Sequence, residues 1–193
     1  MPVREMTFDD IDAVAALRVR AWQSAYADLM PRPFLEAMSV EEDAARRREM
    51  FARGTTHTGR PVTNLVTESA DGKVTGWAAF GPHRPDGPHT SGAPAGAGAD
   101  DAELYAIYVL PELIGTGLGR ELTSSCLERT AREGFTRVLL WVVEGNVRAR
   151  RFYERAGFSP DGAESTEDID GEGTLVQVLR YGRKLRVTGS GSV

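Results

Sequence analysis

Three glycines alternate in residues 115–120, GTGLGR, which follow an apolar run and precede a helical pattern. Alternating glycines let the backbone adopt positive φ and approach a ligand closely. The first N–H groups of the next helix carry a partial positive charge and have no partner inside the helix, so they suit a phosphate or diphosphate. Arg120 adds a charged donor in the first turn. The segment therefore predicts a site for a phosphorylated ligand.

Two common phosphate-binding patterns differ from this turn. A P-loop ends in Gly-Lys followed by Ser or Thr, whereas this turn ends in Gly119, Arg120 and Glu121. A dinucleotide-binding turn has the spacing G-x-G-x-x-G, which these glycines lack, although Glu144 lies near the distance at which such folds place an acid. A tight turn without a ligand is the simpler interpretation of the glycines alone. The glycines alone therefore do not separate a phosphate-binding turn from a purely structural one, and the neighbouring residues have to be considered.

A second motif occupies residues 146–158, NVRARRFYERAGF. Together with the glycine turn and the apolar runs beside it, this segment resembles the GCN5-related N-acetyltransferase (GNAT) family across residues 103–158. Arg20, Trp22 and Tyr26 support the resemblance more weakly. It implies a single α/β (α+β) domain with a mixed central sheet of about six to seven strands flanked by helices. It also implies transfer of an acyl group from acetyl-CoA to an amine by direct attack.

The resemblance implies a set of cofactor-binding residues. They lie on the strand before the turn, in the turn itself and on the helix of the second motif: Ile107, Tyr108, Val109, Ile114, Gly115, Thr116, Gly117, Leu118, Gly119, Arg120, Asn146, Ala149 and Phe152. In the family, the strand separates from its neighbour and its free N–H groups pair with pantetheine and polarise the thioester carbonyl. Ile114 departs from the family, which usually has Gln or Arg there. We therefore expect diphosphate binding to rest on backbone amides, weakened or compensated but not lost.

The thiolate leaving group benefits from a nearby acid. Tyr153 occupies the position at which the family places a tyrosine beside the cofactor sulfur. The alternative is that Phe152 and Tyr153 are both aromatic core, and we expect Phe152 to be largely core. Asn146 begins this helix, so it can cap the helix and, as the resemblance implies, also contact the pantetheine or phosphate portion.

The attacking amine must be neutral, yet a free alkylamine has a pKa of roughly 10, so a base is useful. Glu103 is our candidate, because the resemblance places it at the start of the strand that lines the acceptor site and burial would raise the pKa of its carboxyl. The alternative is a solvated charge beside Asp100 and Asp101. Trp22 and Tyr26 are candidates for contacting the acceptor.

Two further features allow a functional and a structural interpretation. Residues 159–173 hold six acids and no basic residue, a pattern typical of a solvated loop. In the family this segment lies near the acceptor, so it is also a candidate for attracting a cationic amine. Cys126 follows Leu122 by four residues on a helical face, and we interpret it as core rather than as a nucleophile.

The elements that position these residues follow from hydrophobic periodicity. The pattern predicts strands at 3–6, 64–68, 74–80, 103–109, 138–143 and 174–181, and helices at 11–22, 40–51, after the turn, and 146–156. Pro31 and Pro33 are expected to stop the first helix. We expect one domain over 1–182, interrupted by a flexible Gly-, Pro- and Ala-rich insertion at 84–101, and a loose tail over 183–193.

Composition excludes several other classes of protein. The chain has 193 residues, 41% of them hydrophobic and 26% charged, which is typical of one globular domain and not of a disordered chain. A net charge of −5 argues against a nucleic-acid binder. No apolar run is long enough to span a membrane. The histidines, at 57, 83 and 89, do not cluster with Cys126 in a zinc spacing, so we expect no metal.

We therefore expect an acetyl-CoA-dependent N-acetyltransferase whose acceptor is an amine of a small molecule, a peptide or a protein. The single cysteine favours the reducing cytoplasm. A non-catalytic acyl-CoA-binding or interaction module on the same fold is the alternative. The glycine spacing disfavours a dinucleotide-dependent oxidoreductase. A homodimer is suggested by the family resemblance alone.

Overall fold

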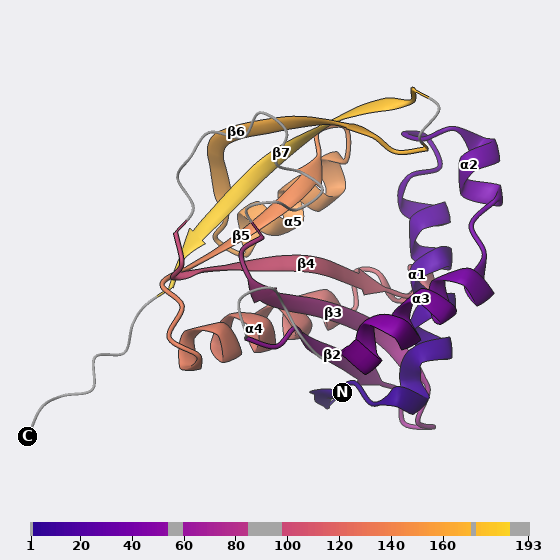
Figure 1. The fold of residues 1–193 in the computed structure, drawn as a ribbon, viewed down its shortest axis with the longest axis horizontal. Coiled ribbons are helices and arrows are strands. Elements are labelled where there is room, and N and C mark those ends of the chain that lie inside the picture. The colour runs from indigo at the N-terminus through magenta and orange to yellow at the C-terminus, as the bar shows by residue number, and fades with distance from the viewer. Residues whose placement is uncertain (1, 54–59, 85–97, 171–172, 186–193) are drawn as a thin grey trace, which may run out of the picture.

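The computed structural model describes residues 2–53, 60–84, 98–170 and 173–185 (Figure 1). Along the chain the elements are β1 (Val3–Glu5), η1 (Phe8–Asp10), α1 (Ile11–Ala25), α2 (Arg32–Glu36), α3 (Val40–Arg53), β2 (Thr63–Glu68), β3 (Val74–Pro82), β4 (Asp101–Val109), η2 (Pro111–Leu113), α4 (Leu118–Arg132), β5 (Arg137–Val143), α5 (Val147–Arg155), β6 (Ser159–Asp168) and β7 (Leu175–Lys184). This confirms the single α/β domain with a mixed sheet.

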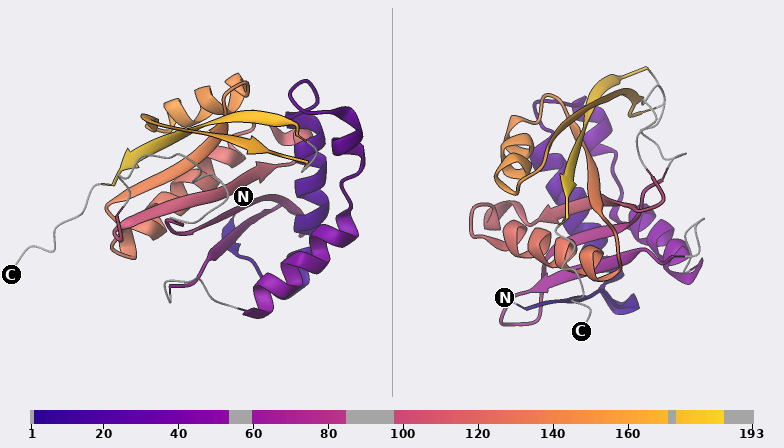
Figure 2. Two further views of the ribbon diagram at one scale, coloured as in Figure 1. Left: turned by 45° about the horizontal axis from the view of Figure 1, so that its top comes forward. Right: turned by 90° about the vertical axis from the view of Figure 1, so that its left-hand side faces the viewer.

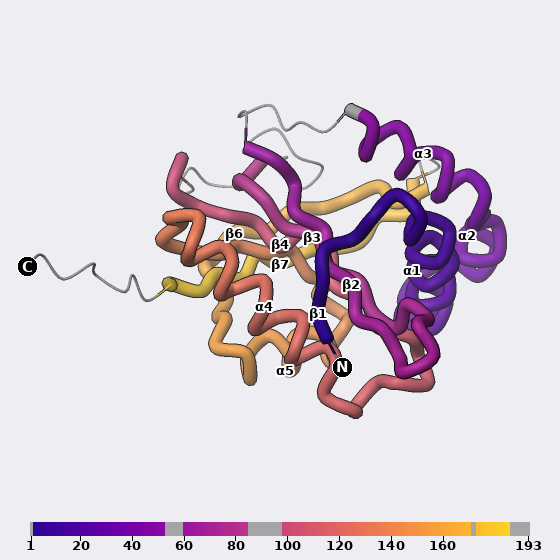
Figure 3. Tube along the Cα trace, turned by 90° about the horizontal axis from the view of Figure 1, so that it is seen from below, coloured from indigo at the N-terminus to yellow at the C-terminus, as the bar shows by residue number. Residues whose placement is uncertain are grey.

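The seven strands form one sheet in the order β1-β2-β3-β4-β5-β7-β6. All neighbours are antiparallel except β4 and β5, which are parallel. Helices α4 and α5 lie on one side of the sheet, and α1, α2 and α3 lie on the other (Figure 3). The β6–β7 hairpin forms the edge farthest from β1 (Figure 2).

A hydrophobic core lies on each face of the sheet. On the α4 side, buried residues such as Leu122, Phe158 and Tyr181 pack together. On the α1 side, Ile11 and Val66 belong to a second cluster. Cys126 is 3% exposed within the first core, and burial raises the pKa of its thiol to about 12. This confirms its interpretation as a core residue.

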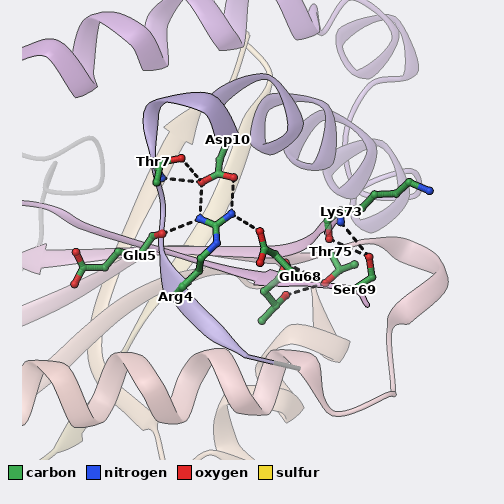
Figure 4. A network of polar contacts seen from close by, with 9 residues as sticks. Arg4, Glu5, Thr7, Asp10, Glu68, Ser69, Lys73 and Thr75 are labelled. Atoms are coloured by element: carbon green, nitrogen blue, oxygen red, sulfur yellow. Dashed lines mark hydrogen bonds and ion pairs between the residues drawn. The ribbon is translucent and has the colours of Figure 1, made fainter. Parts of the chain in front are cut away.

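The start of α1 is fixed to the sheet by Arg4 (Figure 4). The Arg4 guanidinium donates to both carboxylate oxygens of Asp10, at 2.7 and 2.8 Å, and also contacts Glu68 on β2. Asp10 accepts from the Thr7 backbone N–H at 2.7 Å, which caps the 3-10 turn before α1. The hydrogen bond from Arg4 holds the pKa of Asp10 at about 2. The network sets the direction in which α1 crosses the sheet.

The first helix ends before the prolines rather than at them. It ends at Ala25, and a short helix, α2, then includes Pro33 in its first turn. Proline is tolerated there because its missing N–H would have no partner inside the helix. In the described chain no helix combines the length and apolar character that a bilayer span requires.

The acidic segment is a strand, which corrects the expected loop. Strand β6 pairs with β7, and its Ala163 and Ser165 are buried while Glu164 between them is exposed. Long-range pairing with β7 therefore outweighs the local charge pattern. Strand β7 runs past the expected domain boundary at residue 182. Most of the expected insertion and tail, at 85–97 and 186–193, lies outside the described residues.

Strands β4 and β5 diverge soon after they begin, and this divergence creates the site (Figure 1). They pair only where Asp101, Ala102 and Glu103 face the first three residues of β5. Beyond that point the edge of β4 has no ladder partner on β5. On its other edge, the register with β3 shifts so that Tyr105 is an extra, unpaired residue.

Candidate active site

A cavity of about 510 Å³ occupies the space between the diverging strands. Its lining combines β4 from Leu104 onward, the glycine turn, α5 and the end of α1. Most of the predicted site residues line it: Tyr26, Ile107, Tyr108, Val109, Ile114, Gly115, Thr116, Gly117, Gly119, Arg120, Asn146, Ala149, Phe152 and Tyr153. Trp22, Glu103 and Leu118 do not. Leu118 is 4% exposed and its side chain is core, so only its backbone belongs to the turn.

The glycine turn presents free backbone amides to the cavity. Gly115 and Gly117 have φ of 90° and 100°, in the left-handed region that favours glycine. A Cβ added at Gly115 would have no atom within 4 Å, so the backbone there is open to a ligand. Because Leu118, Gly119 and Arg120 form the first turn of α4, their N–H groups have no partners inside the helix. These residues fit the diphosphate of acetyl-CoA.

Positive charge gathers along the same cavity. Arg120, Arg148 and Arg155 line it, and no carboxylate from the described residues does. This arrangement suits a polyanion such as coenzyme A. Only Arg120 was predicted. Arg148 and Arg155 are seven residues apart on α5, a spacing that places them on one face with Phe152, so helical periodicity could have found them.

Tyr153 is half-buried and lines the cavity. Its ring packs edge-on against Phe152 and Phe158, with centroids 5.3 and 6.0 Å apart. Burial raises the pKa of the phenol, so it stays protonated at neutral pH. In the part of the chain that the structure describes, its hydroxyl has no hydrogen-bond partner. Tyr153 can therefore donate a proton to a group in the cavity.

Phe152 packs α5 against α4, and Asn146 caps the start of α5. The Phe152 ring lies over Gly119, where an added Cβ would come within 3.4 Å of ring carbons. Phe152 therefore packs against α4 as well as lining the cavity. Asn146 accepts from the Ala149 backbone N–H at 3.0 Å and so caps α5, as expected. Its side chain also lies beside the Tyr26 hydroxyl.

The other end of the cavity is formed by aromatic side chains. Trp22 Nε1 donates to the Tyr108 hydroxyl at 2.8 Å, and the Trp22 and Tyr26 ring centroids are 4.9 Å apart. Tyr108 also stacks on Trp77. Trp22 thus contacts Tyr26 and Tyr108, which line the cavity, and is not itself part of the lining. Sequence reasoning assigned Tyr108 only a backbone role and missed its side chain.

Glu103 differs from the prediction in its surroundings and in its pKa. It is 3% exposed, and its carboxylate lies 2.6 Å from Arg84 Nη2 and 3.3 Å from His83 Nδ1. Burial alone would raise the pKa of Glu103, but His83 and Arg84 outweigh it and hold the pKa below its ordinary value. Glu103 lies where β4 still pairs with β5. Nothing in this arrangement supports a role as base.

The acids of β6 also lie away from the cavity. Among those in 159–173 that the structure describes, none belongs to the lining. Asp161 pairs instead with Arg180, its carboxylate 2.8 Å from Nε. The segment therefore gives no support to attraction of a cationic acceptor. Nor does the described chain contain a group of three or more His, Cys, Asp or Glu residues that could hold a metal ion.

Comparison with known proteins adds independent evidence. Residues 18–158 match the model of the acetyltransferase (GNAT) family. The chain is 29% identical over 144 residues to the uncharacterized N-acetyltransferase YuaI of Bacillus subtilis, covering 75% of this chain and 72% of that one. It is 30% identical over 158 residues to an uncharacterized N-acetyltransferase of Mycobacterium bovis, covering 81% and 87%. A mycothiol acetyltransferase of Thermobispora bispora is 44% identical, but over 33% of this chain and 22% of its own.

Solved structures show the same fold. The PaiA N-acetyltransferase of Thermoplasma acidophilum in complex with coenzyme A superposes with a TM-score of 0.67 at 18% identity, covering 95% of this chain and 98% of that one. A phosphinothricin acetyltransferase of Sinorhizobium meliloti in complex with AcCoA gives 0.64 at 19% identity, covering 95% and 88%.

Proposed function

We propose that this chain, which belongs to the GNAT family of acetyltransferases, moves an acetyl group from acetyl-CoA to a primary amine of a small molecule, peptide or protein. The observation that carries the proposal is the cavity between β4 and β5. It joins a turn of free amides, suited to a diphosphate, to the protonated hydroxyl of Tyr153, suited to a leaving thiolate.

In the proposed reaction the amine nitrogen attacks the thioester carbonyl carbon. A C–N bond forms and the C–S bond breaks. The nitrogen loses one proton and the sulfur gains one, so the products are an N-acetyl amide and the free thiol of coenzyme A. Tyr153 supplies the proton to sulfur, water takes the proton that the nitrogen loses, and the Tyr153 phenolate, whose pKa is raised by burial, regains a proton from water. The β4 backbone beyond Glu103 aligns the pantetheine arm and the carbonyl.

Ile114 bears on the strength of cofactor binding. It stands where the family usually has Gln or Arg, and 41% of its surface is exposed at the cavity. An isoleucine cannot bond a phosphate. We propose that Arg120, together with Arg148 and Arg155 on α5, compensates through charge.

The alternative is a non-catalytic module that binds acyl-CoA on the same fold. Ile114 favours it, whereas a protonated Tyr153 at the cavity favours an enzyme. We further propose a reducing compartment such as the cytoplasm, because Cys126 is a buried free thiol. A homodimer is proposed on family resemblance alone, and light scattering during gel filtration tests it.

A binding titration and a thiol-release assay test the proposed function. Acetyl-CoA should bind and NAD should not, which separates this fold from a dinucleotide enzyme. A panel of small amines and peptides should then release free thiol in the presence of the protein. Binding of acetyl-CoA with no thiol release above the uncatalysed rate for any amine would favour the non-catalytic module.

A further inference from the structure

The described lining of the cavity offers hydrogen-bond donors but no group that takes up a proton at neutral pH. It contains no carboxylate and no imidazole from residues 2–53, 60–84, 98–170 or 173–185. Its polar side chains are phenols, guanidiniums, one hydroxyl, one carboxamide and one indole: Tyr26, Tyr105, Tyr108, Tyr153, Arg120, Arg148, Arg155, Thr116, Asn146 and Trp141. A protonated amine would find no anionic partner among them.

The phenols of Tyr26, Tyr108 and Tyr153 are donors in this cavity and not bases, whereas the Tyr105 hydroxyl already donates to the Pro82 carbonyl. Burial raises the pKa of Tyr26, Tyr105, Tyr108 and Tyr153, so each stays neutral well above pH 7. For Tyr26, the neighbouring phenols of Tyr108 and Tyr153 raise the pKa further. The hydroxyls of Tyr26, Tyr108 and Tyr153 thus lie near one another, and none is a resting phenolate that could take a proton from an ammonium at neutral pH.

Trp22 strengthens this donor character at Tyr108. An indole N–H can only donate, so the bond from Trp22 Nε1 uses a lone pair of the Tyr108 hydroxyl. The hydroxyl's own hydrogen has no acceptor within the described chain. Because Tyr108 lines the cavity, that hydrogen is available to a bound substrate.

The charge behind Tyr108 is positive as well. The carboxylate of Asp43 is 2.7 Å from Arg18 Nη1, 2.6 Å from Arg47 Nε and 3.3 Å from Arg46 Nη2. Arg18 stacks on Trp22 and Arg47 stacks on Trp77, the two aromatic partners of Tyr108. Because three guanidiniums share one carboxylate, the group of side chains around Asp43 carries a net positive charge. It disfavours an ammonium group at the acceptor end.

We infer, building on the proposed function, that the acceptor is a weakly basic amine that enters the cavity uncharged. The α-amino group of a peptide is an amine of this kind. Such a group has a pKa of roughly 7.7–8.0, whereas a lysine side chain has one of roughly 10.4. At pH 7.5 about a third of the α-amine is neutral, but only about 0.1% of the lysine. The described part of the lining thereby selects by basicity, since none of its side chains takes a proton from an ammonium at neutral pH.

Two peptides of one sequence test this inference. One keeps its α-amine free and has its single lysine acetylated, and the other has an acetylated N-terminus and a free lysine. Thiol release gives kcat/KM for each between pH 6 and 9.5. We expect the α-amine to be preferred about 100-fold or more at pH 7.5. Its kcat/KM should level off above its own pKa, while that of the lysine peptide should still be rising at pH 9.5.

A protein base would give a different profile. It would bind the ammonium and deprotonate it, so both peptides would share one inflection below pH 7.5. That result, or a preference for lysine, would overturn the inference while leaving acetyl transfer intact. If acetyl-CoA binds but no amine in the panel releases thiol, the proposed function itself fails. The two failures are therefore distinguishable.

Discussion

The two ends of the cavity are built in different ways. The end that we propose for the cofactor is mainly backbone from one continuous segment, the turn at 115–117 and the first amides of α4, with arginines of α4 and α5 beside it. The end that we propose for the acceptor is made of side chains from three elements, Tyr26 of α1, Tyr108 of β4 and Tyr153 of α5. Binding of acetyl-CoA thus depends on local conformation, whereas turnover depends on long-range packing. Substitutions at the two ends should therefore have separate effects, on the affinity for acetyl-CoA at one end and on the rate of acetyl transfer at the other.

The largest effect is expected from Tyr153→Phe, which removes the hydroxyl and keeps the packed ring. The rate of acetyl transfer should fall about 100-fold or more, the usual worth of a general acid. The Kd for acetyl-CoA should change little, because the turn is untouched. Tyr181→Phe is a matched control, since that buried hydroxyl bonds Glu154 outside the cavity. Wild-type turnover in Tyr153→Phe would leave Tyr153 with a packing role only.

Gly117→Val should act at the opposite end. A valine at φ of 100° is strained, and its side chain would occupy space that the diphosphate needs. We expect acetyl-CoA binding, measured by calorimetry, to weaken at least tenfold, or about 1.4 kcal/mol. Gly134→Val controls for backbone strain, because Gly134 also has positive φ but lies after the far end of α4. Equal losses in both variants would contradict a specific site at the turn.

A smaller effect is expected from Tyr108→Phe. One hydrogen bond to the acceptor is worth roughly 0.5–1.5 kcal/mol, so kcat/KM for the amine should fall about three- to tenfold. The Kd for acetyl-CoA should be unchanged. Trp22→Phe removes the donor that orients the same hydroxyl, so the double variant should lose less than the sum of the two. Additive losses in the cycle would show that Trp22 and Tyr108 act separately.

The smallest effect on turnover is expected from Glu103→Gln. Because Glu103 is ion-paired with Arg84 outside the cavity lining, the rate should change less than about twofold. The free energy of unfolding at pH 7 should fall by about 1–3 kcal/mol, since a buried partner of Arg84 loses its charge. A rate loss of about 100-fold in a folded variant would instead make Glu103 the base.

The stability cost of Glu103→Gln should also depend on pH. The folded protein holds the pKa of Glu103 below its ordinary value, so the carboxylate stabilises the fold above that ordinary value. This contribution is lost as the pH falls through the folded pKa. Denaturant unfolding at pH 7 and at pH 3 should therefore show a smaller difference between wild type and variant at pH 3.

The cofactor end could be predicted because its information is local. Glycine spacing, the helix start and the Asn146 cap all lie within a few residues of the groups they position. The pairing of β4 with β5 agrees with the divergence that the family resemblance implies. The same kind of reasoning predicted every strand along the chain except β6, because each is a short apolar or alternating run.

The acceptor end could not be predicted in the same way. The pKa of Glu103, which lies outside the cavity lining, is lowered by His83 and Arg84, and the orientation of Tyr108 depends on Trp22, a residue far from it in sequence. None of these partners can be identified from periodicity. The loop predicted from the charge run at 159–173 was wrong for a related reason. Strand β6 is stabilised by hydrogen bonds to β7, and the local sequence pattern does not contain them.

The unpaired residue Tyr105 decides which way the later side chains of β4 point. Before Tyr105, the side chains that face the core beside α4 are those of the even-numbered Ala102 and Leu104. After Tyr105, they are those of the odd-numbered Ile107 and Val109. Tyr108 therefore faces α1. Without the extra residue, Tyr108 would turn toward α4 and leave Trp22 without its acceptor. The position of this hydroxyl is thus set by the number of residues in the strand as much as by their identity.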